Sequence, residues 1–582
     1  MAFLNLTSQI GTNYIPSEEE LDHIKNSLLP VPTDKLASLE IEINRAYEIY
    51  SSLLEQRQAL LDEIQGYRGL ISPARRLPVD VLQEVFLHTL PTSHNAVIDP
   101  QQCPILLTRI CRGWRSIALS TPQLWSSIHI PVPHITRRQI NQWGPINFLN
   151  LPEEFKMSTL SSLKNYATII SNWLGRSGAS PLSITLHDAQ SFSVPKEHYE
   201  IIIDSFLPFA NLWKNLILDT YSLFLGPIAE LTASDVPILE SLALHDLTSD
   251  TIDPDSHPIL WKRSGLVRAP SLKRIDYTPV RDNLNDFSLK WGQLTDIKLW
   301  NDQSHWGHPN IHGTLSNLVL ILSLCPRLIN FHAEIRLLPD SAVAVPSSIS
   351  SLSLPNLQKL VYYDAGVDCR PLFELLDVPS LLHLKFFPYD HSSQTVLPTF
   401  LPHVASTLLS LSTYIAFFVD PNHFPALTQC QKLTSIIIPE SVSVGRDPWA
   451  PPTVQILKDI LLDNMTLPSG HPDRLAPALE HFECWAGGRF SDAALLRFIK
   501  AKQSRPDIAT LKKIFIAFTV PKETDIFLDG DIARYVADGL SIVLRYPLGL
   551  DPKEPFEMLP AHQGVPRAEH WAPESWPNYY DV

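Results

Sequence analysis

The feature that most restricts the fold is a short pattern that recurs along the second half of the chain. It reads Pro, any residue, Leu, two residues, an aliphatic or aromatic residue, one residue, and an apolar or aromatic residue. Self-similarity of this kind is typical of repeat arrays. Copies with the proline begin at Pro237, Pro270, Pro326, Pro355, Pro379 and Pro477, and copies without it begin at Trp213, Leu294, Leu408, Leu433 and Leu511.

Each copy predicts a strand whose second and third apolar positions point one way while the intervening residues point the other. The leading proline is expected where the preceding helix stops, at the first position of the strand. No single unit can bury its apolar face, so neighbouring units stack. The fold class is therefore α/β, with an irregular leucine-rich-repeat-like solenoid and a curved parallel sheet over residues 201–545. An ordinary α/β domain is the less favoured alternative, because the motif repeats with its proline in register.

The intervening strand residues are expected to share the concave face of this sheet. They mix charges with Trp and Tyr, which are common anchors of protein-binding surfaces. The predicted face comprises Arg274, Asp276, Asp296, Lys298, Trp300, Asn330, His332, Glu334, Lys359, Tyr363, His383, Lys385, His481, Glu483 and Trp485.

The stretch from Thr33 to Tyr67 predicts one long helix with a coiled-coil stripe, in an all-α N-terminal part. Apolar residues fall on two seven-residue series that adjoin on a helix, and only Arg57 interrupts them. The first series is Leu36, Ile43, Tyr50 and Ile64, and the second is Leu39, Ala46, Leu53, Leu60 and Tyr67. The stripe either forms a homodimer through residues 33–67 or packs on the next domain. Residues 1–32 are expected to be disordered or loosely packed.

Two apolar helices follow, in "SPARRLPVDVLQEVFLHTL" and "PILLTRICRGWRSIALSTPQLW". Pro78 suits the first helical position, and a second helix is expected from about residue 104. Their stripes comprise Val81, Leu82, Val85, Phe86 and Leu90, then Leu106, Leu107, Ile110, Cys111, Trp114 and Ile117. A unit of about fifty residues cannot bury such wide apolar faces alone. Some of this surface is joined to the next domain or offered to another protein.

Within these helices, "LPVDVLQEVF" resembles the opening of an F-box, and "RICRGWRSIA" resembles its second half. Further on, "WLGRSGASPLSITL" is similar to a stretch that follows the F-box in many fungal F-box proteins. The resemblance places an F-box at residues 72–130. Residues 131–200 then form a linker and the first strand and helix of the repeat domain.

The resemblance implies docking to a Skp-type adaptor and, through it, to a cullin ubiquitin ligase. Val81, Leu106 and Ile117 are expected to face inward. The alternative is that all these side chains only build a local core. Carried over position by position, the adaptor contacts are Leu77, Pro78, Leu82, Val85, Phe86, Leu107, Ile110, Cys111 and Trp114.

Searching for chemistry yields no phosphate-binding loop, nucleophile elbow, dinucleotide fingerprint or zinc-protease motif. "HWGHPNIH" brings His305, His308 and His312 together, but in a Gly/Pro/Asn loop without fixed geometry. We predict no catalytic residue, no cofactor and no metal. The net charge of −15 argues against nucleic acid as a partner.

Scattered cysteines, with no paired spacing, suit a reducing compartment. The N-terminal stretch lacks the pattern of a secretory signal, and the apolar runs are too short to cross a bilayer. The expectation is a soluble protein of the cytoplasm, the nucleus or both, without a membrane partner. Residues 546–582, rich in Pro, are either disordered or strapped across the last repeats.

Two functions from different classes remain open. The first is a substrate receptor, in which the F-box holds the ligase and the repeats hold a protein substrate. The second is a non-catalytic scaffold that keeps the F-box-like element but joins no ligase, dimerised through the long helix. An enzyme is a distant third.

Overall fold

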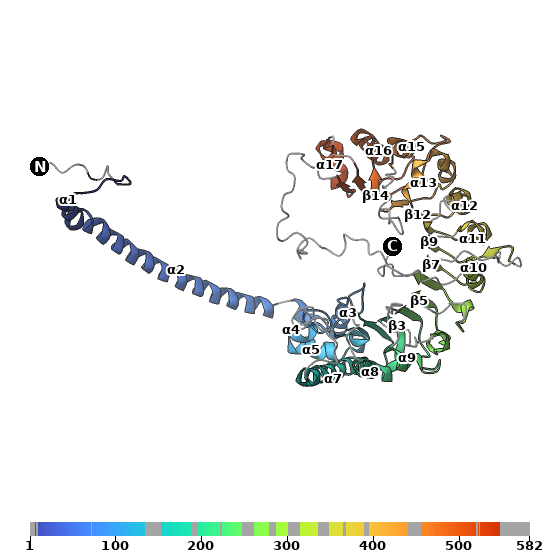
Figure 1. Cartoon of the computed structure of the whole chain (residues 1–582), viewed down its shortest axis with the longest axis horizontal. Helices are drawn as coiled ribbons and strands as arrows, with labels where there is room; N and C mark the ends of the chain where they lie inside the picture. Colours follow the sequence, from blue (N-terminus) through green and yellow to red (C-terminus); the bar gives the residue numbers. More distant parts are fainter. Residues whose placement is uncertain are drawn as a thin grey trace. The chain divides into compact units, whose positions relative to one another are not determined.

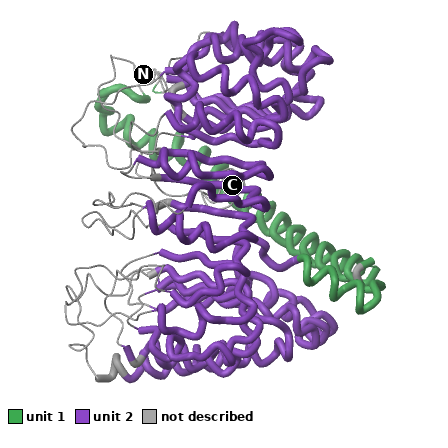
Figure 2. Tube along the Cα trace, turned by 90° about the vertical axis from the view of Figure 1, so that its right-hand side faces the viewer, with its two compact units in different colours: residues 1–88 green, residues 89–582 purple. Residues whose placement is uncertain are grey.

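The computed structural model describes residues 6, 10–71, 73–133, 153–188, 196–220, 224–246, 261–278, 287–300, 315–335, 349–364, 368–388, 395–439, 456–519, 522 and 524–546. Two compact units divide the chain, residues 1–88 and residues 89–582 (Figure 2). In the described part, no helix is both long enough and apolar enough for a bilayer crossing.

Unit 1 is mostly helical from Glu18 onward. Its elements are α1 (Glu18–His23), a π-helical turn (Ile24–Leu28), α2 (Pro30–Leu70), a 3-10 turn (Pro73–Arg76) and α3 (Val79–Leu87). The long helix predicted for residues 33–67 is confirmed, and no side chain of α2 is buried. Helical structure begins earlier than expected, because Ser17 and Glu20 form a capping box that starts α1.

Unit 2 contains a sheet of 14 strands that are all parallel and follow one another in chain order (Figure 1). The order never reverses, unlike that of a doubly wound domain. Its strands are β1 (Ser127–Pro131), β2 (Leu182–His187), β3 (Trp213–Thr220), β4 (Ser241–Asp246), β5 (Arg274–Thr278), β6 (Asp296–Trp300), β7 (Asn330–Ile335), β9 (Lys359–Asp364), β11 (His383–Pro388), β12 (Ser410–Thr413), β13 (Ser435–Ile438), β14 (His481–Gly488), β15 (Lys513–Phe518) and β16 (Ser541–Arg545).

Two of the described helices of unit 2 precede the first strand, and the others connect the strands and lie along one side of the sheet (Figure 1). They are α4 (Leu107–Ile110), α5 (Arg112–Leu119), α7 (Glu153–Gly175), α8 (Lys196–Phe206), α9 (Gly226–Ala229), α10 (Leu315–Ser323), α11 (Arg370–Leu375), α12 (Val396–Val404), α13 (Ile415–Val419), α14 (Phe424–Thr428), α15 (Asp459–Asn464), α16 (Asp492–Ser504) and α17 (Gly530–Ala537). A second, two-stranded parallel sheet pairs β8 (Leu352–Ser353) with β10 (Leu376–Asp377).

One unbroken column of apolar side chains crosses the large sheet. The column consists of the second paired residue of every strand, and all but the last member are at most 2% exposed. Its members are Ile128, Ile184, Leu216, Leu242, Ile275, Ile297, Phe331, Leu360, Leu384, Leu411, Ile436, Phe482, Ile514 and Ile542. This confirms that the second apolar position of each motif points into the core.

The proline of each motif lies outside the strand, which corrects its expected place at the first strand position. Each strand begins four residues after its proline, as β5 begins at Arg274 after Pro270. Proline has no N–H for the ladder, so it occupies the turn that precedes the strand. Two residues on, the motif leucine is buried in that turn, as Leu272 and Leu381 illustrate.

The sheet starts earlier than the repeat pattern indicated. Strand β1 begins within the predicted F-box segment 72–130, and β2 lies within residues 131–200, where a linker and the first strand and helix of the repeat domain were expected. Unit 2 also includes α4 and α5, whereas α3 belongs to unit 1. Trp125 joins α5 to α7, because its indole N–H donates to the Ala118 carbonyl and its ring meets Trp173 edge-on at 4.9 Å. The Trp173 indole N–H in turn donates to the Ser127 carbonyl of β1 at 3.2 Å.

We expected a single second helix from about residue 104, and this prediction is wrong. It is divided into α4 and α5 at Cys111, whose backbone is extended with φ −157° and ψ 170°. Cys111 serves as the N-cap of α5, and its Sγ accepts from the Trp114 N–H at 3.4 Å. The break leaves carbonyls of α4 free of helical partners, and Arg115 Nε donates to one of them, that of Thr108, at 2.8 Å.

We predict that Gly265→Ala destabilises unit 2 by roughly 1–3 kcal/mol, the usual cost of overpacking. The Gly265 N–H donates to the Leu231 carbonyl at 2.9 Å, and an added Cβ would lie 2.3 Å from that oxygen. Backbone on both sides of the contact cannot move aside cheaply. Chemical denaturation measures the change in the unfolding midpoint.

Gly292→Ala is the matched control, because an added Cβ there meets nothing within 4 Å. It should alter the free energy of unfolding by no more than about 0.5 kcal/mol. Equal stability of the two variants would contradict the close backbone contact at Gly265.

Candidate interaction surfaces

The face of the sheet opposite the apolar column carries rows of polar and aromatic side chains. The first row is formed by the residue preceding the column in each strand, and every member is polar. It consists of Ser127, Ser183, Asn215, Ser241, Arg274, Asp296, Asn330, Lys359, His383, Ser410, Ser435, His481, Lys513 and Ser541.

Strand register places the predicted concave-face residues on this one face. Arg274, Asp296, Asn330, Lys359, His383 and His481 lie in the first row; Asp276, Lys298, His332, Lys385 and Glu483 lie two residues further along; Trp300, Glu334 and Tyr363 form part of a third row. Trp485 continues the alternation after Glu483 in β14. The side chains of Trp300 and Glu334 are outside the described structure, so only their backbone register is known.

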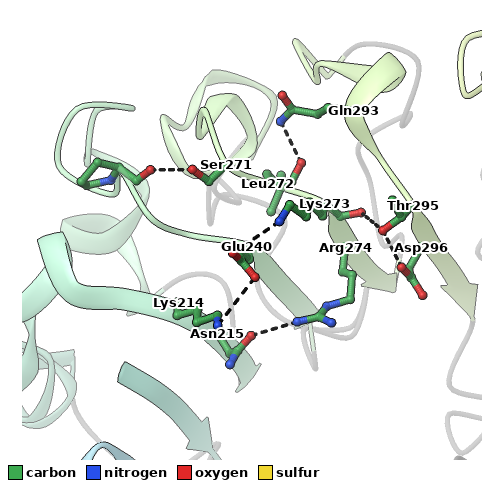
Figure 3. A network of polar contacts seen from close by, with 11 residues as sticks. Lys214, Asn215, Glu240, Ser271, Leu272, Lys273, Arg274, Gln293, Thr295 and Asp296 are labelled. Carbon is green, nitrogen blue, oxygen red and sulfur yellow. Dashed lines mark hydrogen bonds and ion pairs between the residues drawn. The ribbon is translucent and has the colours of Figure 1, made fainter. Parts of the chain in front are cut away.

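Side chains of the first row are linked across strands by hydrogen bonds. Asn215 Nδ2 donates to Ser183 Oγ at 2.8 Å, and Arg274 donates to Asn215 Oδ1 at 3.3 Å. Figure 3 shows the second of these bonds, beside the pairing of Glu240 with Lys273 and Lys214 at the start of the strands. These three members of the first row are therefore connected side chain to side chain.

Histidine and carboxylate side chains form two groups on the N-terminal strands. His187 Nδ1 lies 2.6 Å from Asp219 Oδ2, and this hydrogen bond raises the pKa of His187. Asp276 lies between His245, at 3.3 Å, and Lys298, at 3.1 Å. Burial alone would raise the pKa of Asp276, but the hydrogen bonds and positive charges of these two neighbours outweigh it and hold the pKa below its ordinary value.

The middle strands combine aromatic rings with cationic groups. Tyr363 stacks on Phe387 with ring centroids 4.6 Å apart, and His332 stacks on Tyr363 at 6.2 Å. Burial, with the charge of Lys359, lowers the pKa of Lys385 to about 8. The same two causes lower the pKa of His383. Burial and the neighbouring charge therefore favour the neutral forms of Lys385 and His383 in this part of the face.

The C-terminal strands carry a second aromatic and cationic group. Trp485 stacks on Phe515 at 4.0 Å, and the Arg545 guanidinium lies over both rings. Glu483 accepts from the Trp485 indole N–H at 3.1 Å and pairs with Lys513 at 2.8 Å. Stacking leaves Tyr363 and Trp485 half-buried, less open than we expected of anchoring aromatics.

Sequence reasoning missed several residues of this face. Phe387 and Phe515 were not predicted. Phe387 follows the last apolar position of its motif, and Phe515 lies between two apolar positions of its motif. Lys513 and Arg545 were also missed. Motif alternation identifies Phe387, Lys513 and Phe515, whereas β16 has no motif copy to indicate Arg545.

The predicted adaptor contacts separate into exposed and buried groups. Leu77, Val85 and Ile110 are 39%, 43% and 53% exposed, and Pro78 and Cys111 are also exposed. Trp114 is half-buried. Leu82, Phe86 and Leu107 are at most 6% exposed, so they cannot contact a partner in this conformation.

Three expected inward residues also need correction. Val81 and Leu106 are exposed and Ile117 is half-buried, so the expectation that all three face the core is wrong. Pro78 is the N-cap of α3 and not its first helical residue. The buried residues of α3 are Leu82 and Phe86, four residues apart, which leaves Val81 on the exposed side of the helix.

No cluster of three metal-ligating side chains occurs among the residues that the structure describes. His305, His308 and His312 lie outside them, as does the Pro-rich tail beyond Tyr546. No protein-family model matches the chain, and no curated protein matches it.

We predict that Asp276→Asn lowers the free energy of unfolding by roughly 1–3 kcal/mol at pH 7, because it removes the charged partner of Lys298. The folded-state pKa of Asp276 is depressed, so its contribution is fully present above the ordinary carboxyl pKa. It is lost as the pH falls through the folded-state value.

Denaturant titrations from pH 7 to pH 3 measure this difference. Asp204→Asn, at an exposed carboxylate of α8, is the control and should behave like the wild type. A wild-type advantage over Asp276→Asn that grows below pH 4 would contradict the assignment.

Proposed function

We propose that this chain is a protein-binding receptor whose parallel repeats form a leucine-rich-repeat solenoid. The observation that carries the proposal is the polar and aromatic face that continues across 14 strands in register. Every strand contributes to it in the same way, while the chemistry of the side chains changes from strand to strand. Such a surface suits recognition of a protein rather than a small molecule.

The F-box resemblance adds a docking element for a Skp-type adaptor. Exposed Leu77, Pro78 and Val85 on one segment, and Ile110 and Cys111 on the other, are the contacts that an adaptor would use. Exposed aliphatic side chains of this kind are available to a partner without any change of the fold. Through the adaptor, a cullin ubiquitin ligase would join the complex.

Catalysis in this proposal belongs to the other subunits. The chain tethers a protein substrate near the ligase, which raises the effective concentration of the substrate at the site of ubiquitin transfer. No side chain of the repeats needs to take part in a bond-making step. The face of the sheet opposite the apolar column is called the open face. Its middle and C-terminal groups, where aromatic rings and cations lie together, bind the substrate in this proposal.

A scaffold that joins no ligase is the second candidate, and one observation favours it. Leu82, Phe86 and Leu107 lie in the chain's own interior, which leaves an adaptor a smaller apolar surface than the resemblance implies. In that case the open face would bind its partner without ubiquitin transfer.

We predict that Leu77→Ala with Ile110→Ala weakens adaptor binding on the order of a hundredfold. Each side chain would contribute roughly 1.5–3 kcal/mol on full burial, and partial burial of the pair accounts for the smaller total. Both are exposed in the free chain, so their removal should leave the fold intact. Co-purification with a Skp-type adaptor and cullin, quantified by a binding titration, measures the loss.

Ile169→Ala is the matched control, because Ile169 is an aliphatic residue of α7 with similar exposure and no predicted contact. Its binding should equal that of the wild type. Wild-type protein that retains no adaptor would reject the ligase proposal and leave the scaffold.

A further inference from the structure

The long helix α2 exposes an apolar stripe along its whole length. It spans 41 residues as one helix (Figure 1), and none of its side chains is buried. Leu39, Ile43 and Leu53 are each more than half exposed. Isolated helices gain little stability from propensity alone, and most helical stability comes from packing of an apolar face.

The pattern of the stripe identifies the kind of partner. In heptad terms, Leu36, Ile43, Tyr50, Arg57 and Ile64 occupy position a, and Leu39, Ala46, Leu53, Leu60 and Tyr67 occupy position d. Ile occupies two of these five a positions and Leu three of the five d positions, and β-branched residues at a with Leu at d favour a two-stranded coiled coil. The outermost position f carries mostly acidic residues, which suits a face that stays in water.

We propose that the occupant of this stripe is α2 of a second copy of the chain, aligned parallel and in register. Charges beside the stripe support this partner and this direction. In the parallel pair, Lys35 at position g faces Glu40 at position e of the second copy. At the other end of the helix, Glu63 at g faces Arg68 at e in the same way.

The antiparallel arrangement lacks this complementarity. When the two apolar series are aligned in opposite directions, Glu42 of one copy lies near Glu63 of the other, at both ends of the pair. Like charges at such flanking positions are destabilising. The central flanking positions are uncharged, and Ile49 at g and Leu54 at e add apolar contact area in the parallel pair without setting its direction.

Arg57 has a defined role in the dimer. It is the single charged residue at position a, and one polar residue there fixes register at a cost in stability. Two guanidinium groups face each other across the parallel seam, where they can turn outward toward solvent. Arg57→Ile should therefore tighten association, by about tenfold or more, while it weakens the choice of register.

Dimerisation would give the protein two open sheet faces and two sets of adaptor contacts in one particle. A ligand with two copies of a binding motif, or a target that itself dimerises, would then bind with avidity. The inference concerns α2 alone and holds whether or not an adaptor binds the neighbouring segment.

Sedimentation equilibrium of the full chain across a range of concentrations tests the proposal. The wild type should have twice the mass of one chain, and Leu53→Glu with Leu60→Glu should have the mass of one chain at every concentration tested. Ile41→Glu with Ala59→Glu, at the outer positions f and c, is the charge-matched control and should remain dimeric. Thermal unfolding of unit 2 checks that all variants keep the repeat fold.

Direction is tested by Leu39→Cys in a background that carries Cys111→Ser, which removes an exposed thiol. Parallel helices bring the two Leu39→Cys thiols together, so oxidation should yield a covalent dimer. In antiparallel helices they lie far apart. A wild type with the mass of one chain or of three, a dimer that survives Leu53→Glu with Leu60→Glu, or a dimer without the cross-link would each overturn the proposal.

Discussion

The structure depends on the apolar column that crosses the sheet of unit 2. One aliphatic or phenylalanine side chain from each strand packs beside the same position of the next strand, away from water. Backbone hydrogen bonds at the strand entrances keep this spacing, since Lys273 N–H donates to Glu240, Thr295 N–H to Lys273, and Ile329 N–H to Thr295, all at 2.7–2.8 Å. A slip of one residue in any strand would place polar side chains in the core.

The same column determines which side chains lie on the opposite, open face of the sheet. Because side chains alternate along a strand, fixing one residue in the core fixes its neighbours on the opposite face. The fold therefore constrains the positions of these neighbours but not their chemistry. One scaffold therefore carries three different surfaces. Histidine lies with carboxylate on the N-terminal strands, lysine with tyrosine in the middle, and tryptophan with arginine at the C-terminal end.

Much of this arrangement could be predicted from the sequence, because the motif positions report side-chain alternation directly. Ile275 and Asp276 illustrate the success, one buried in the column and the other on the open face. Strands β1 and β16 escaped prediction because neither carries the motif. The break at Cys111 also escaped it, because a periodic apolar pattern continues through a cap residue whose extended backbone leaves no mark in hydropathy.

The helical segment marks the limit of such reasoning. Apolar periodicity indicates which residues leave water, but it does not tell a side chain buried within the chain from one kept for a partner. Phe86 and Val85 are neighbours in the same predicted contact set, yet the first is buried and the second is exposed. Distinguishing them requires the tertiary structure, because burial depends on which elements pack against the helix.

The central claim is that two separate surfaces bind two separate partners, and affinity purification followed by mass spectrometry tests it most directly. Three proteins are compared: the wild type, the Leu77→Ala/Ile110→Ala variant, and Lys359→Glu/His383→Glu on the first row of the open face. The account predicts that the helical variant loses adaptor and cullin but keeps the other captured proteins, while the sheet variant keeps adaptor and cullin and loses a defined protein. A sheet variant that, correctly folded, captures the same proteins as the wild type would contradict the account.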